Sequence, residues 1–185
     1  MKKIIFTILL LAVAIGFFYL LKLDHTPEDQ EIGNITSANM EISSTQFTNN
    51  GKFPVKYTCD GQDINPPLAF SGTPEEMQSL VLIVDDPDAP SGTWVHWTVF
   101  NIDPKTTEIK ENSVPQKAIE GLTSYDTQGY KGPCPPSGTH RYFFKIYALD
   151  TILELDKTAK FSDIEQKMEG HILDQAEIIG LYTRD

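Results

Sequence analysis

The stretch "SLVLIVDD" (Ser79–Asp86) limits most strongly what this chain can fold into. It is apolar without interruption from Leu80 until two acids end it, whereas a strand with one face in water alternates apolar and polar side chains. A strand of this kind is covered on both faces. Two later stretches, Thr93–Ile102 and His140–Leu149, also carry bulky side chains on both faces. The sequence therefore predicts a sheet whose central strands are buried.

Strict alternation assigns the side chains of the two later strands to faces. One face of the first is predicted to carry Trp94, His96, Thr98 and Phe100, and the other Val95, Trp97 and Val99. In the second, one face holds His140, Tyr142, Phe144 and Ile146, and the other holds Arg141, Phe143, Lys145 and Tyr147. His140 and Tyr142 are thus expected side by side.

The remaining elements are predicted from local signals. Met40–Phe47 and Phe53–Thr58 are expected to be strands on either side of a turn at "TNNG", and Thr73–Met77 a short capped turn. One longer helix is expected over residues 161–180, with Ser162 and Glu165 as a capping box and Gly180 as its stop. Strands come first and no β-α-β alternation appears. The predicted fold class is mainly β, an antiparallel sandwich with a C-terminal helix.

The N-terminus differs from the rest of the chain. Two lysines precede an uncharged apolar run from Ile4 to Leu21, close to the roughly 20 residues of a spanning helix. Residues 1–23 are expected to be a membrane anchor with the lysines in the cytoplasm, or alternatively a cleaved signal. Residues 24–39 form a polar linker, and residues 40–185 form the folded domain. That domain is expected outside the cytoplasm, on the cell membrane, or in the periplasm or medium after cleavage.

Charge and cysteine content limit the kinds of partner and metal that the chain is expected to bind. Residues 25–185 hold 12 basic and 25 acidic side chains, a formal net charge of −13, and no basic stripe, which argues against nucleic acid. Cys59 and Cys134 can form a disulfide in an exported domain, or remain two thiols. Two cysteines without a second pair do not make a zinc site. No His-Glu-x-x-His spacing occurs either, so neither metal nor cofactor is expected.

Polar residues gather in two stretches with stiff, proline-rich loops. "DDPDAPSGTWVHW" supplies Asp86, Asp88 and His96, and "GPCPPSGTHRY" leads to His140 and Tyr142. Imidazole N–H and phenol O–H groups can hold a small anion, while the aspartates can orient an imidazole or accept from a cationic group. This set is compatible with a ligand such as a phosphate ester that carries an amine.

Structural roles are open for the same residues. His96 can be a core histidine, and the two aspartates can be turn residues that bond their own backbone. Arg141, on the opposite face from His140, is expected to form a structural ion pair. Trp97 is expected in the core, and Trp94 is a candidate for the wall of a site.

These two motifs resemble the phosphatidylethanolamine-binding protein family, in particular its bacterial and archaeal Raf-kinase-inhibitor-like branch. "DPDAP" is followed by "WVHW" and then by "GPCPPSGTHRYFFKIYALD"; "YTCDGQDINPPLAFSGTP" and "MEGHILDQAEIIGLYTR" are similar too. The resemblance extends from Glu41 to Arg184. It implies a large antiparallel sheet packed on a smaller one, with an anion pocket at one end.

The resemblance also implies roles for particular residues. Asp86, Asp88, Pro90 and His96 correspond to the family's first motif, and His140, Arg141 and Tyr142 to its second. The pocket would be lined by Asp86, His96, His140 and Tyr142, with Arg141 structural. The chain departs from eukaryotic members at Cys134, at Val95 and in its short C-terminus.

The function expected from the sequence is a non-catalytic, extracytoplasmic module that binds small anionic, phosphate-type ligands such as phospholipid headgroups. It can also modulate a kinase or a protease. The alternative is a hydrolase of phosphate or acyl esters, with His96 or His140 as general base and Asp86 as its orienting partner. No Gly-x-Ser-x-Gly motif supplies a nucleophile.

Overall fold

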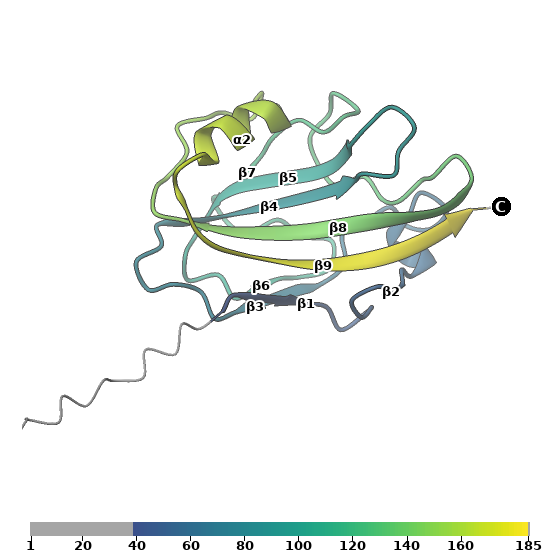
Figure 1. Cartoon of the computed structure of the whole chain (residues 1–185), viewed down its shortest axis with the longest axis horizontal. Coiled ribbons are helices and arrows are strands. Elements are labelled where there is room, and N and C mark those ends of the chain that lie inside the picture. Colours follow the sequence, from purple (N-terminus) through teal and green to yellow (C-terminus); the bar gives the residue numbers. More distant parts are fainter. Residues whose placement is uncertain (1–38, 185) are drawn as a thin grey trace, which may run out of the picture. The chain divides into compact units, whose positions relative to one another are not determined.

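The computed structural model describes residues 39–184, which form two β-sheets and one α-helix (Figure 1). The large sheet has the strand order β2-β9-β8-β4-β5-β7, and the small sheet has the order β1-β3-β6. Every pairing is antiparallel except that of β2 with β9. The elements are β1 (Glu41–Ser43), β2 (Gly51–Lys52), the 3-10 helix η1 (Val55–Tyr57), β3 (Leu68–Ser71), β4 (Ser79–Asp86), β5 (Trp94–Ile102), β6 (Glu108–Ile109), β7 (Ile119–Glu120), β8 (Gly138–Leu149), α2 (Phe161–Met168) and β9 (Ile172–Arg184). The predicted mainly-β class with two sheets is confirmed.

Strand β4 lies between β8 and β5, and all eight of its residues are buried. Its alternate side chains enter two separate cores. Leu80, Leu82 and Val84 pack between the two sheets, whereas Val81 and Ile83 pack under α2. The continuous apolar run of this strand is therefore explained by layers on both faces of the large sheet, as Figure 1 shows.

The helix predicted over residues 161–180 is wrong in its second half. Helix α2 ends at Met168, and a turn with Gly170 at φ +80° leads into β9. Strand β9 pairs along the whole of β8, which would otherwise leave the hydrogen-bonding groups of one edge unpaired. Gly180 does not stop a helix but lies inside β9, where a Cβ atom would come within 2.5 Å of the Phe53 ring.

The start of α2 also differs from the prediction. Ser162 and Glu165 do not form its capping box, because the helix begins one residue before Ser162, at Phe161. Instead, the backbone N–H of Lys160 donates to the carboxylate of Asp163 at 2.9 Å. The buried face of the helix is short and consists of Ile164 and Met168.

Two predicted strands near the start of the domain are shorter or absent. Phe53–Thr58 contains η1 rather than a strand, since Pro54 has no N–H to continue the pairing that Phe53 makes with Leu181. Strand β1 ends at Ser43, because the next residue, Ser44, turns its hydroxyl to the Pro67 carbonyl. The turn at 48–51 is confirmed. Thr73–Met77 holds only one non-helical turn, closed by a bond from Met77 to Pro74.

The predicted anchor (1–23) and nearly all of the linker (24–39) lie outside the described residues. Within residues 39–184 there is no helix of the length and apolar character that a membrane crossing requires. Cys59 and Cys134 form a disulfide, which decides between the two states left open by the sequence.

Candidate functional site

A bulge in β5 determines which side chains meet at one end of the large sheet. Val84 of β4 pairs with Trp97 and the next residue, Asp85, pairs with Val95, so His96 has no partner of its own. A bulge of this type re-aims the extra side chain. The ring of His96 consequently lies against Tyr142, with 5.3 Å between the ring centroids.

The bulge overturns the predicted assignment of faces in β5. His96 does not share a face with Thr98 and Phe100, because alternation is broken between Val95 and Trp97. Phe100 belongs to the core under α2, whereas Tyr142 belongs to the core between the sheets. Trp94 pairs with Asp86 at the end of β4 and therefore lies at the same end of the sheet as His96.

Asp86 and His140 form a buried pair on neighbouring strands. The Nδ1 atom of His140 lies 2.7 Å from Oδ2 of Asp86, and the two residues are only 8% and 3% exposed. The second carboxylate oxygen, Oδ1, accepts the backbone N–H of Asp88 at 2.8 Å. Both oxygens of Asp86 thus have donors, as a buried carboxylate requires.

His96 is held by the backbone of the loop between β7 and β8. Its Nδ1 atom lies 2.7 Å from the carbonyl oxygen of Lys131, and the residue is 3% exposed. Burial lowers the pKa of His96, against the smaller opposing effects of that hydrogen bond and of the Asp86 and Asp63 charges. The ring is therefore neutral near pH 7.

Tyr142 brings a buried hydroxyl to the same cluster. The residue has no exposed surface, and its hydroxyl makes no hydrogen bond of normal distance and angle among the described residues, although the Asp86 carboxylate and the Cys134 backbone lie near enough to affect its pKa. Burial, and then the negative charge of Asp86, raise the pKa of Tyr142 far above its usual value, so the hydroxyl stays protonated and can donate. Buried polar atoms of folded proteins are rarely left without a partner, and such an atom calls for an explanation.

The remaining candidates lie around these four residues rather than among them. The guanidinium of Arg141 donates to both carboxylate oxygens of Asp88, at 2.7 and 2.9 Å. These hydrogen bonds lower the pKa of Asp88 to about 2. Pro90 is exposed in the loop after β4. Trp94 is half-buried and makes an edge contact with Tyr125, 5.3 Å between centroids.

Sequence reasoning missed three groups that border the cluster. The Tyr125 ring lies 6.0 Å from that of His96, and the Lys131 carbonyl fixes the orientation of His96. The Asp63 carboxylate accepts the N–H of Gly132, the residue after Lys131, at 2.6 Å. None of them stands in a recognisable motif, because each reaches the cluster through the path of a loop.

The loop at residues 131–134 is fixed at several points. The N–H of Lys131 donates to the His96 carbonyl, and the Cys59 N–H donates to that of Pro133. A Cβ atom on Gly132 would lie 2.4 Å from the Tyr57 carbonyl oxygen, so only glycine allows this approach. The disulfide from Cys134 to Cys59 closes the arrangement. The carbonyl that orients His96 is therefore held rigidly.

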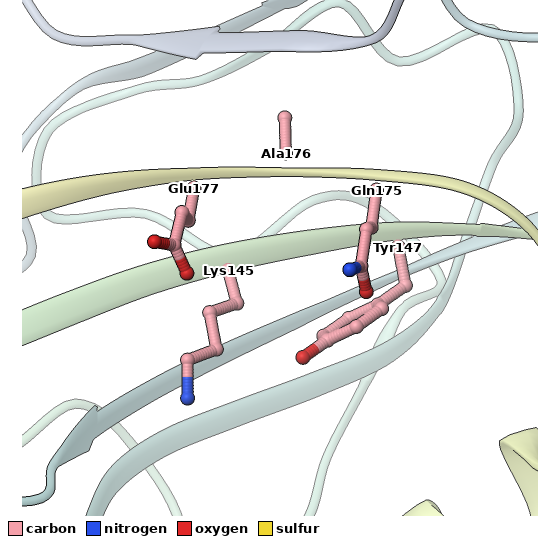
Figure 2. Close-up of a pocket in the computed structure, with 5 residues that line it drawn as sticks. All are labelled: Lys145, Tyr147, Gln175, Ala176 and Glu177. Carbon is pink, nitrogen blue, oxygen red and sulfur yellow. The ribbon is translucent and has the colours of Figure 1, made fainter.

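A polar hollow of about 240 Å³ lies on the face of β8 and β9 opposite Tyr142. Figure 2 shows Lys145, Tyr147, Gln175 and Glu177 projecting to one side of these strands, with Ala176 on the other. Lys145 donates to the carboxylate of Asp85 at 2.6 Å, and burial raises the pKa of Asp85 despite this partner. No set of three or more His, Cys, Asp or Glu residues that could bind a metal occurs within residues 39–184.

Two β-sheets, with a buried histidine–aspartate–tyrosine cluster at one end of the larger sheet, make this domain a β-sandwich. The family model described as phosphatidylethanolamine-binding protein matches residues 43–183. The chain belongs to this family.

For several relatives, the match to this chain extends over most of the relative's own length. A UPF0098 protein of Methanothermobacter thermautotrophicus is 49% identical over 150 residues, 78% of this chain and 99% of its own. A crystal structure of a phosphatidylethanolamine-binding protein homolog from Chlamydia trachomatis is 40% identical, with a TM-score of 0.77, and covers 80% of this chain and all of its own. The E. coli protein YbcL, described as a member of the mammalian family, is 28% identical, with a TM-score of 0.76 and the same coverage. Family membership suggests a ligand-binding role.

Proposed function

We propose that this domain binds small anionic, phosphate-type ligands on the extracytoplasmic side of a membrane, in the cluster formed by Asp86, His96, His140 and Tyr142. The observation that carries the proposal is the buried Tyr142 hydroxyl beside Asp86, which forms no hydrogen bond of normal geometry in the described part of the chain. A ligand oxygen would supply the missing acceptor. The disulfide between Cys59 and Cys134 is compatible with an oxidising compartment.

Each member of the cluster has a separate role in this proposal. Tyr142 donates its O–H. The Asp86 carboxylate accepts from Nδ1 of His140, so Nε2 of His140 accepts a hydrogen bond when the ring is neutral and donates only when both ring nitrogens carry a hydrogen. Trp94 and Tyr125 contribute apolar surface at the edge of the cluster.

Ligand-induced thermal stabilisation tests this function. The full chain in a non-ionic detergent is expected to gain thermal stability on addition of millimolar phosphorylethanolamine, because a ligand that binds only the folded state stabilises it. His140→Ala should abolish the gain, while His171→Ala, which alters an exposed pair with Asp150, should retain it. Equal stabilisation of the two variants, or none in the unaltered chain, would contradict the assignment.

The hydrolase alternative draws on one observation, the hydrogen bond between Asp86 and His140 at 2.7 Å. A carboxylate in this position can orient an imidazole that acts as general base. Steady turnover of a phosphate or acyl ester that is lost in His140→Ala and kept in His171→Ala would favour an enzyme over a binding module.

A further inference from the structure

The proton on His96 can be placed from its surroundings. A carbonyl oxygen only accepts hydrogen bonds, so the short contact between Nδ1 of His96 and the Lys131 oxygen places a hydrogen on Nδ1. Burial lowers the pKa of His96, which keeps the ring neutral. In a neutral imidazole with its hydrogen on Nδ1, the other nitrogen, Nε2, is a hydrogen-bond acceptor.

The Nε2 atom of His96 has no assigned partner within the described residues. It makes no hydrogen bond of normal distance and angle there, although the Gly132 backbone lies close enough to the ring to favour its charged form, and it is not one of the three fully enclosed unpartnered atoms, which are Asp85 Oδ1, Thr98 Oγ1 and Tyr142 Oη. Some of the 3% exposed surface of His96 must therefore belong to this side of the ring. An incoming ligand meets an acceptor at this point.

Burial makes an added proton on His96 costly in free energy, in spite of the charges around the ring. The carboxylates of Asp86 and Asp63 favour it, but burial outweighs them, and the neighbouring Tyr125 and Tyr142 are neutral phenols. The direct partner of Nδ1 is an uncharged carbonyl, whereas that of His140 is a carboxylate. The guanidinium of Arg141, the residue after His140, donates to the carboxylate of Asp88. A hydrogen bond between Nε2 of His96 and the ligand therefore costs less free energy when the ligand carries the proton than when the ring is charged.

We propose that His96 selects a protonated ligand oxygen, so that the site prefers phosphate monoesters bound as monoanions over phosphodiesters and sulfate. This inference rests on the proposed function and narrows its ligand class. A phosphate monoester loses its second proton at a pKa of about 6 and can carry an O–H to Nε2. A diester, such as an intact phospholipid, and a sulfate ion have no such proton near neutral pH. They would place an oxygen lone pair against that of Nε2.

Calorimetry on the full chain in a non-ionic detergent tests this preference at pH 6, close to the second pKa of a monoester, so that little free energy is spent on protonating the ligand. The probes are phosphorylethanolamine (a monoester), glycerophosphorylethanolamine (a diester) and sulfate. We expect the monoester to bind at least about tenfold more tightly than the diester, because an unmatched buried polar group costs about that factor or more. Heats measured in two buffers of different ionisation enthalpy should show uptake of about half a proton per monoester, since about half of the free ligand is dianionic near its pKa of about 6.

The variant His96→Gln separates selection from simple binding. An amide offers both a donor and an acceptor and needs no proton, so the preference should fall to within about twofold and the proton uptake should disappear. His171→Gln, in the exposed pair, is the matched control and should keep both.

The outcomes distinguish a failure of the proposed function from a failure of the selection by His96. If none of the three probes binds the unaltered chain, the proposed function fails and this inference fails with it. If monoester and diester bind with equal affinity, or if the monoester binds without proton uptake, the anion site stands and the selection by His96 is refuted.

Discussion

Two histidine–aspartate pairs in this domain have almost the same geometry and different surroundings. Nδ1 of His140 lies 2.7 Å from Asp86, and Nδ1 of His171 lies 2.8 Å from Asp150. The side chains of the first pair are 10% and 4% exposed, whereas those of the second are 48% and 47% exposed. Water and dissolved salt weaken the exposed pair, while the buried pair has to be satisfied by the protein or a ligand. Burial, rather than the pairing itself, marks the first pair as a candidate site.

The largest expected difference between the two pairs is in stability. Asp86→Ala should lower the free energy of unfolding by about 3 kcal/mol, because it leaves His140 and the Asp88 N–H without their buried acceptor. Asp150→Ala should lower it by less than about 0.5 kcal/mol. Urea denaturation of both variants measures the difference. Losses of similar size would mean that burial does not distinguish the pairs.

A second comparison sets two fully buried tyrosines against each other. The hydroxyl of Tyr142 makes no hydrogen bond of normal geometry among the described residues, whereas the hydroxyl of Tyr57 donates to Glu111 at 2.6 Å. Tyr57→Phe should lower the free energy of unfolding by about 1 kcal/mol and leave ligand binding intact. Tyr142→Phe should change stability by less than about 0.5 kcal/mol and weaken phosphorylethanolamine binding roughly tenfold. Chemical denaturation and calorimetry on both variants measure these effects. A loss of stability in Tyr142→Phe together with a loss of binding in Tyr57→Phe would contradict the comparison.

The smallest expected effect concerns the exposed neighbour of the cluster, the Asp88–Arg141 ion pair. The folded-state pKa of Asp88, about 2, lies below its unfolded value, so this carboxylate contributes stability above pH 4 that is lost as the pH falls towards 2. Asp88→Asn should lower the free energy of unfolding by at most about 1 kcal/mol at pH 7, since Arg141 is half exposed. Denaturation curves at pH 7, 4 and 2 should show the difference between variant and parent shrinking. A difference that is constant over this range would show that the ionised carboxylate is not responsible.

The sequence predicts an element well when the residues of that element alone decide its structure. Strand β4 is evident because an unbroken apolar run has a single interpretation once its length excludes a long helix. In β9, by contrast, Ile172, Ala176 and Ile179 satisfy helical spacing, and the strand forms because β8 offers an edge to pair with. Pairing between distant segments decides such cases, and local periodicity does not contain it.

The candidate site shows the same division. The two motifs bring Asp86, His140 and Tyr142 together through simple alternation along β4 and β8. His96 reaches them through a bulge, which exists only in relation to the register of β4, and strict alternation gives it the wrong face. The Lys131 carbonyl is a backbone group, and every residue has one, so no side-chain pattern could have indicated its role.

Magnetic resonance of the histidine ring nitrogens during a titration with phosphorylethanolamine tests the central claim most directly. The ring signals of His96 and His140 should shift together and saturate, while those of His171 stay in place, because the two cluster histidines are buried beside the proposed ligand and His171 is exposed to water. If the signals of His96 and His140 do not move at millimolar ligand, or if His171 moves as far as they do, the buried cluster is not the ligand site.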